Sequence, residues 1–129
     1  MSSLYHDLII DHYKNPRNFG VLENPDAVAQ EANASCGDLI EFQIKIKKTE
    51  NREQKTMISE VAWRGVGCAI STAAASLLSE KIRSKEYGVK KILELTDEDM
   101  VKMLGGDISP TRLKCATLSL KALQKALRN

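Results

Sequence analysis

Residues 40–47 alternate strictly between apolar and polar side chains, and this alternation constrains the fold more than any other feature of the chain. The apolar members are Ile40, Phe42, Ile44 and Ile46, and each is followed by a charged or amide side chain. A period of two residues indicates an antiparallel strand with one buried face and one solvated face. The buried face needs a covering layer, so the sequence predicts an α+β fold: a small antiparallel β-sheet with helices packed on one face.

A second strand is predicted over residues 57–64, with a bulge near Ser59 where the alternation slips. The polar residues 49–55 between the two strands predict a hairpin connection. Cys36 precedes the first strand and Cys68 follows the second. Because an antiparallel hairpin places those two strand ends side by side, the two cysteines are expected to meet at one end of the sheet.

The N-terminal part of the chain predicts one helix and a long loop. Residues 4–13 have the spacing of a short amphipathic helix, which ends before Pro16. His12 at its end is expected to cap carbonyl groups rather than to bind a metal. The polar stretch that follows predicts a loop as far as Ser35.

The C-terminal half predicts four helices. The first covers residues 70–82 and is stopped by Gly88, and a short helix follows over residues 89–93. A capping-box-like start at residues 96–99 opens a third helix, which ends at the glycine pair 105–106. Ser109 and Pro110 open the last helix, since serine favours the cap and proline the first helical position.

The bulk composition describes an ordinary globular chain. Its 129 residues, 43% hydrophobic, predict a single domain over residues 1–129. A net charge of +2 and few aromatic residues argue against nucleic acid as a partner. No apolar run approaches the roughly 18 residues that span a bilayer, and no secretory signal is evident, so a cytoplasmic protein without a membrane partner is expected.

Four side chains are candidate metal ligands: Cys36, Asp38, Cys68 and Cys115. An odd number of cysteines in a reducing compartment favours metal or thiol chemistry over a disulfide framework, although dispersed cysteines can also be ordinary core residues. Three thiolates and a carboxylate suit tetrahedral zinc or an iron–sulfur cluster. The carboxylate is the harder and weaker ligand, which makes such a site less permanent and favours transfer over storage.

The cysteines at helix starts are also candidates for sulfur chemistry. Cys68 is expected at a helix N-terminus, where the macrodipole and free N–H groups stabilise a thiolate. Cys115 lies in or near the first turn of the last helix, so the same argument predicts a low pKa there. Lys114, next to Cys115, could support that thiolate by its charge or could be an ordinary surface lysine.

Four segments together resemble the U-type iron–sulfur cluster assembly scaffold family, which includes IscU, SufU and the N-terminal part of NifU. They are DHYKNPRN at residues 11–18, SCGD at 35–38, GVGCAIS at 65–71 and KCATL at 114–118. These segments occur in the family order and nearly span the chain. By position, Cys36, Cys68 and Cys115 look like the family's ligand cysteines, and Asp38 looks like its aspartate.

The resemblance implies a scaffold rather than an enzyme. Such a protein accepts persulfide sulfur from a cysteine desulfurase on one of its cysteines. With iron, it assembles a transient [2Fe-2S] cluster on three cysteines and Asp38, in one protomer or shared by a homodimer. The cluster then passes to iron–sulfur acceptor proteins. The alternative is a SufU-like, zinc-dependent sulfurtransferase, in which zinc takes the place of the cluster and one cysteine relays sulfur from the desulfurase.

The sequence departs from both main branches of that family. Lys114 stands where the Isc-like branch has a histidine, and residues 108–112 replace its Leu-Pro-Pro-Val-Lys chaperone motif. Lysine at this position is similar to the Suf-like branch. However, that branch has an insertion between its second and third cysteines, and the short interval between Cys68 and Cys115 lacks it. Both readings therefore stay open at this stage, and a small module with only a structural zinc is a third.

Overall fold

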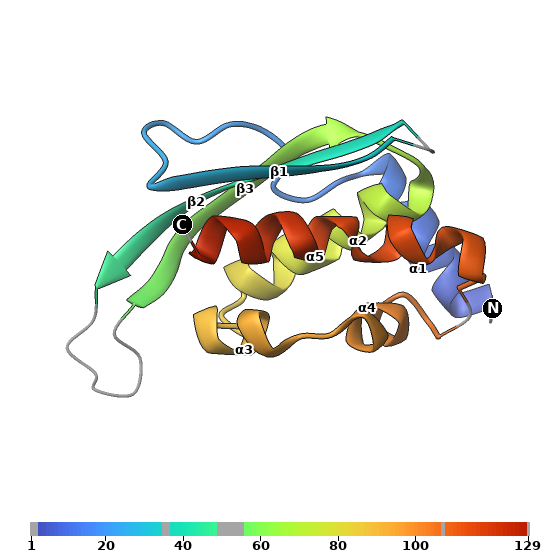
Figure 1. The fold of residues 1–129 in the computed structure, drawn as a ribbon. Coiled ribbons are helices and arrows are strands. Elements are labelled where there is room, and N and C mark those ends of the chain that lie inside the picture. Colours follow the sequence, from blue (N-terminus) through green and yellow to red (C-terminus); the bar gives the residue numbers. More distant parts are fainter. Residues whose placement is uncertain (1–2, 35–36, 49–55, 107, 129) are drawn as a thin grey trace.

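A computed structural model describes residues 3–34, 37–48, 56–106 and 108–128 (Figure 1). Its three strands are β1 (Ala27–Asn33), β2 (Asp38–Lys48) and β3 (Thr56–Val66). They form one antiparallel sheet in the order β1-β2-β3. Ile40, Phe42 and Ile44 are all fully buried, so the alternating stretch of the sequence is the central strand that it predicts.

The bulge lies where the alternation slips. Lys45 pairs with Glu60, but the next residue, Ile46, pairs with Ile58, so Ser59 has no partner across the sheet. The Ser59 hydroxyl instead donates to the Lys45 carbonyl at 3.2 Å. Beyond the bulge the register returns the apolar side chains of β3 to the buried face, because one extra residue restores the period of two.

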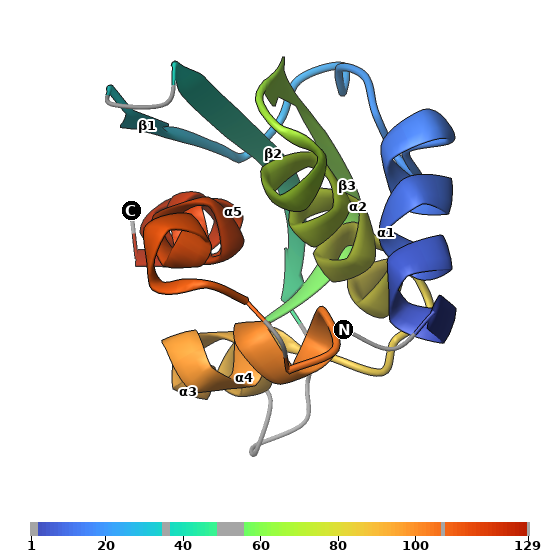
Figure 2. The same cartoon turned by 90° about the vertical axis from the view of Figure 1, so that its right-hand side faces the viewer.

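The helices cover one face of this sheet (Figures 1 and 2). In chain order they are α1 (Ser3–Lys14), α2 (Ala69–Arg83), α3 (Val89–Glu94), α4 (Asp97–Met103), the 3-10 turn η1 (Pro110–Arg112) and α5 (Leu113–Arg128). Helix α5 packs on β1 and β2, α2 packs on β3, and α1 lies against α2. The predicted α+β class, with helices on one face of a small antiparallel sheet, is confirmed.

The hydrophobic core lies between the sheet and the pair α2 and α5. Its largest fully buried side chains from the strands and these two helices are Trp63, Phe42, Ile40, Ile44, Leu78, Leu120 and Leu123, and α3, α4 and the residue after α4 add Ile92, Met100 and Leu104. Burying a side chain of this size contributes about 1.5–3 kcal/mol, so these contacts fix how the two helices sit on the strands. Both helices begin at the same end of the sheet, where β2 starts and β3 ends.

One structural prediction about the N-terminal half is wrong. Residues 27–33, predicted as loop, form the edge strand β1, which pairs with β2 from Ala27–Ile44 to Asn33–Asp38. Its inward positions carry small or polar side chains such as Ala29, so the sequence lacks the alternation of large apolar residues that marks a strand. The predicted hairpin at residues 49–55 lies outside the described residues.

Helix α2 ends at Arg83, one residue beyond the predicted 70–82, but Gly88 is not what stops it. Instead, Lys85 takes a left-handed conformation (φ +67°) and donates its N–H to the Ile82 carbonyl. Gly88 is the residue that precedes α3. Ser109 and Pro110 open a 3-10 turn, and the α-helix proper begins three residues later, at Leu113.

Candidate metal and sulfur site

The end of the hairpin places Asp38 beside Cys68. Asp38 is the first residue of β2, and its neighbour Leu39 pairs with Val66, the last residue of β3. The chain leaves the sheet there, and Cys68 precedes the first residue of α2 with an extended backbone. The Cys68 N–H donates to Asp38 Oδ1 at 3.2 Å, which ties the start of one element to the end of the other.

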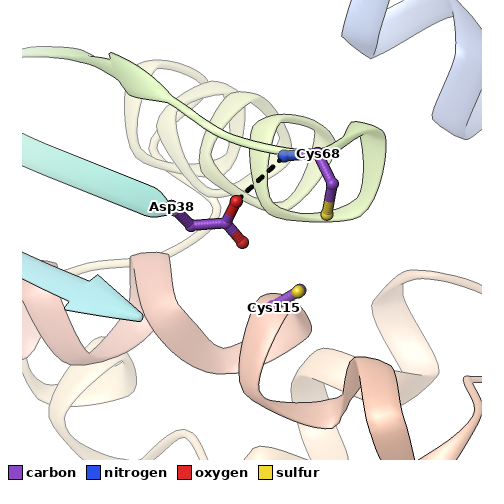
Figure 3. Close-up of side chains that lie close together, drawn as sticks. All are labelled: Asp38, Cys68 and Cys115. Carbon is purple, nitrogen blue, oxygen red and sulfur yellow. Dashed lines mark hydrogen bonds between the residues drawn. The ribbon is translucent and has the colours of Figure 1, made fainter. Parts of the chain in front are cut away.

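Helix α5 brings Cys115 to the same point (Figure 3). Its first turn reaches this end of the sheet, and one ligand atom from each of Asp38, Cys68 and Cys115 lies within 4.8 Å of the other two. Three residues that are 30 to 77 positions apart in sequence thus form one compact cluster. The structure describes these three of the four predicted ligands, and Cys36 lies outside the described residues.

The cluster is buried at its base and open at Cys68. Asp38 is only 3% exposed and Cys115 is fully buried, whereas Cys68 is partly exposed. Asp38 Oδ2 is buried and makes no hydrogen bond within the described residues. A buried carboxylate oxygen without a partner is costly, and a cation at this position would compensate it. Two thiols and this oxygen could therefore hold a metal ion.

The two thiols have opposite pKa shifts. Burial raises the pKa of Cys68, but the N–H and hydroxyl of Ser71, together with Cys115 and the N–H of Ile70, outweigh burial and leave this pKa below its usual value. Burial, Asp38 and Cys68 together raise the pKa of Cys115 to about 12. In the metal-free protein, Cys68 is thus the thiol that ionises more readily.

The prediction of a low pKa for Cys115 is therefore wrong. Cys115 does lie in the first turn of α5, as expected. However, complete burial removes the water that would stabilise a thiolate, and the neighbouring carboxylate adds a repulsive charge. The helix N-terminus stabilises a thiolate by about 0.3–1 kcal/mol, which is too little to overcome both effects.

Sequence reasoning missed Ser71 as a residue of the site. Ser71 is fully buried, and its hydroxyl donates to the Cys68 carbonyl at 3.1 Å. The available signal was a serine three residues after a cysteine at a helix start, the spacing at which one turn of helix brings two residues together. Lys114, in contrast, is exposed on the first turn of α5.

His12 was expected to cap the carbonyl groups at the end of α1, but the structure gives its ring a different hydrogen-bond partner. It is 2% exposed, and its Nδ1 lies 2.7 Å from the hydroxyl of Ser76 on α2. The same hydroxyl accepts the N–H of Arg17 at 2.9 Å. Residues of the DHYKNPRN segment therefore attach α1 to α2, and His12 is outside the cluster formed by Asp38 and the two cysteines.

A family model described as "NifU-like N terminal domain" matches residues 4–129 of this chain. The chain belongs to the NifU-like N-terminal domain family. The match covers every element of the fold, from α1 to α5, and every described residue of the cluster. The resemblance to U-type scaffolds that the four sequence segments indicated is thereby confirmed.

The relatives of this family member include proteins named as scaffolds and a protein named as a sulfurtransferase. The iron–sulfur cluster assembly scaffold protein IscU of Aquifex aeolicus is 34% identical over 129 residues, covering 100% of this chain and 77% of that protein. The zinc-dependent sulfurtransferase SufU of Bacillus subtilis is 34% identical over 142 residues, covering 98% of this chain and 91% of that protein. Identity is thus equal toward a scaffold and toward a sulfurtransferase.

Solved structures show the same fold. A putative iron–sulfur cluster assembly scaffold protein for the SUF system from Fervidobacterium islandicum superposes with a TM-score of 0.72 at 25% identity, covering 98% of this chain and 99% of that one. A hypothetical protein superposes with a TM-score of 0.71 at 27% identity over the full length of both chains. Within the described residues of this family member, no helix has the length and hydropathy of a membrane span.

Proposed function

We propose that this protein is an iron–sulfur cluster assembly scaffold built on one domain, residues 1–129, and acting in the cytoplasm. The observation that carries the proposal is the convergence of Asp38, Cys68 and Cys115, from three separate elements, at one end of the sheet. Cys36, two residues before Asp38, supplies the remaining thiolate. Family membership and the IscU relatives support this reading.

Sulfur arrives as a persulfide carried by a cysteine desulfurase. A scaffold thiolate attacks the outer sulfur of that persulfide, a new S–S bond forms on the scaffold, and the desulfurase thiolate leaves. Cys36, Cys68 and Cys115 are the candidate acceptors, and Lys114 could favour the approach of an anionic persulfide. Of the two described thiols, Cys68 is the more exposed and has the lower pKa, which suits it better to this attack.

The cluster is cargo, so the ligand set must also release it. Iron and sulfide form the [2Fe-2S] cluster on the three cysteines and Asp38, within one protomer or between two, once an external reductant supplies electrons to the sulfane sulfur. Carboxylate oxygen binds iron in such clusters more weakly than thiolate does. Asp38 is thus the ligand at which transfer to an acceptor protein begins.

This role of Asp38 gives a direct test. The Asp38→Ala variant is expected to hold its assembled cluster several-fold longer than the parent when an apo acceptor protein is added, as followed by visible absorption. Faster loss from the variant would show that Asp38 is needed to retain the cluster, and the release argument would then be wrong.

A zinc-dependent sulfurtransferase is the second candidate. The short distances between the donor atoms of Asp38, Cys68 and Cys115 favour it. All three donor atoms lie within 4.8 Å of one another. Tetrahedral zinc with Zn–S bonds of about 2.3 Å places its sulfur ligands about 3.8 Å apart, so the donors are close to the spacing for a single ion. Asp38, Cys68 and Cys115, with Cys36, would hold the zinc, and zinc when bound keeps its thiolate ligands deprotonated.

A third reading, a module with a structural zinc only, is the weakest. A chain of this length buries enough surface to fold without a metal. Removal of metal by a chelator is therefore expected to leave the thermal unfolding temperature nearly unchanged. A fall of 10 °C or more would instead favour a structural role.

One experiment separates the first two readings. The protein is purified without oxygen, its zinc and iron are measured, and desulfurase, cysteine and ferrous iron are then added while the visible spectrum is recorded. Brown colour with about one iron or more per protomer and little zinc supports the scaffold. A colourless protein that retains one tight zinc and accelerates the desulfurase overturns the scaffold in favour of the sulfurtransferase. The mass of the loaded protein shows whether two protomers share the cluster.

A further inference from the structure

Asp38 is held by only one of its two oxygens. Oδ1 accepts the N–H of Cys68 at 3.2 Å, while Oδ2 is buried and makes no hydrogen bond within the described residues (Figure 3). The carboxylate is therefore oriented before any metal arrives. Oδ1 accepts from the backbone of Cys68, itself a candidate ligand, and the lone pairs of Oδ2 are available for a cation.

The missing side chain of Gly67 leaves room for Asp38 to accept the Cys68 N–H. A Cβ added at Gly67 would lie 3.2 Å from Asp38 Oδ1 and 3.3 Å from Asp38 Cγ, and it would overlap the hydroxyl oxygen of Ser71. Gly67 has an ordinary backbone conformation, since its φ is not in the left-handed region. Glycine is therefore needed here for space and not for conformation.

Ser71 occupies the other side of that space. Its side chain is fully buried against Gly67, and its hydroxyl donates to the Cys68 carbonyl at 3.1 Å. Both backbone polar groups of Cys68 are thus engaged: its N–H donates to Asp38, and its carbonyl accepts from the Ser71 hydroxyl and from the N–H of Thr72 at 3.0 Å. Through Cys68, Ser71 therefore contributes to the position of Asp38.

We propose that Gly67 and Ser71 are positioning residues that hold Asp38 as a ligand through Oδ2 alone. This inference rests on the proposed function, because it concerns the same metal site. A carboxylate that ligates through one oxygen makes one bond where a chelating carboxylate makes two, so its exchange needs one bond to break. Gly67 and Ser71 thereby tune how readily the site releases what it holds.

The test uses Co²⁺ as the probe, titrated into the metal-free full-length protein without desulfurase. Its visible bands report tetrahedral thiolate ligation, and the titration gives an affinity. Gly67→Ala is expected to weaken Co²⁺ binding by about tenfold or more, the effect typical of losing a group that orients a ligand. Ser71→Ala/Gly67→Ala removes the overlap with the hydroxyl but keeps the contact of the new Cβ with Asp38, so it is expected to bind Co²⁺ several-fold more weakly than Ser71→Ala.

Two comparisons separate positioning of Asp38 from general damage. In an Asp38→Ala background, Gly67→Ala is expected to cause no further loss of affinity beyond about twofold, since the residue it displaces is already absent. Ser79→Ala removes another fully buried hydroxyl from α2, distant in sequence from the cluster, and is expected to bind Co²⁺ as the parent does. Parent-like binding by Gly67→Ala, or an equal loss in the Asp38→Ala background, would overturn the proposal.

If Gly67→Ala fails to fold, the proposal is tested with variants that lack the Ser71 hydroxyl and therefore its overlap with the new Cβ. Ser71→Ala/Gly67→Ala is then compared with Ser71→Ala, with and without Asp38. A several-fold loss only when Asp38 is present supports the proposal, and an equal effect in both backgrounds overturns it. A protein that gives these Co²⁺ results but neither builds a cluster nor relays sulfur would lose the proposed function and keep this inference.

Discussion

Cys68 and Cys115 occupy equivalent places in the fold but have opposite chemistry. Each lies at the start of a helix at the same end of the sheet, Cys68 just before α2 and Cys115 in the first turn of α5. Cys68 is partly exposed and has a lowered pKa, while Cys115 is fully buried and has a pKa of about 12. Position at a helix end alone therefore does not decide the state of a thiol: hydrogen-bond donors outweigh burial at Cys68, whereas burial, Asp38 and Cys68 raise the pKa of Cys115.

The largest expected effect is on thiol reactivity. In metal-free protein at pH 8, iodoacetamide is expected to modify Cys68 at least about tenfold faster than Cys115. The pKa of Cys68 is lowered and that of Cys115 is about 12, so a much larger fraction of Cys68 is thiolate, and the lower nucleophilicity of the more acidic thiol offsets only part of this advantage. Peptide mapping by mass spectrometry gives the two rates. The ratio should fall toward one in denaturant, and equal rates in the folded protein would refute the contrast.

Replacement by serine should separate the two positions by stability. Cys115→Ser places a hydroxyl in a fully buried site and is expected to cost about 1–3 kcal/mol in the free energy of unfolding. Cys68→Ser is expected to be neutral or stabilising by up to about 1 kcal/mol. The reason is that Cys68 is the N-cap of α2, a position where a serine hydroxyl is a better hydrogen-bond acceptor than a thiol. Urea unfolding of metal-free protein measures both, and equal losses would contradict the comparison.

Asp38 is expected to account for part of the raised Cys115 pKa. Asp38→Asn keeps the shape of the side chain but removes its charge, so Cys115 should react several-fold faster with iodoacetamide while Cys68 changes less. The effect is smaller than the first because burial, the larger cause, remains. Glu41→Gln, on the same strand but paired with Arg64, is the control and should leave both rates unchanged.

The smallest expected effect concerns His12, and it tests whether burial also outweighs the helix dipole at the C-terminal end of α1. His12 lies in the last turn of α1, where the macrodipole favours a cation, yet burial and the nearby Arg17 lower its pKa. Glu80 and Asp11 oppose this shift but do not cancel it. The unfolded chain therefore binds a proton that the folded protein does not, and stability should fall as the pH falls below about 6.5.

Urea midpoints between pH 8 and pH 5 measure this loss, which corresponds to at most one proton. His12→Gln should be less stable at pH 8 but should lack the decline, and His6→Gln, which alters an exposed side chain, should retain it. A His12→Gln variant with the same decline as the parent would assign it to another group.

Much of the fold could be predicted from local patterns. The alternation at residues 40–47, the slip at Ser59 and the capping box at Thr96 each reflect neighbouring residues along the chain, and the structure contains the strand, the bulge and the cap. Strand β1 could not be predicted in this way. Its small side chains have no periodic signal, and it forms because β2 offers hydrogen bonds and α5 covers it.

The sequence by itself determined which chemistry was available: three cysteines and an aspartate at the ends of elements, within three of the four segments that follow the family's order. Only the tertiary structure decided how these groups behave. Asp38, Cys68 and Cys115 meet because β2, β3 and α5 pack together, and burial then separates the two thiols by their pKa. Ser71 and Gly67 matter for the same reason, since hydrogen bonds and excluded volume depend on distances across the fold that sequence spacing does not encode.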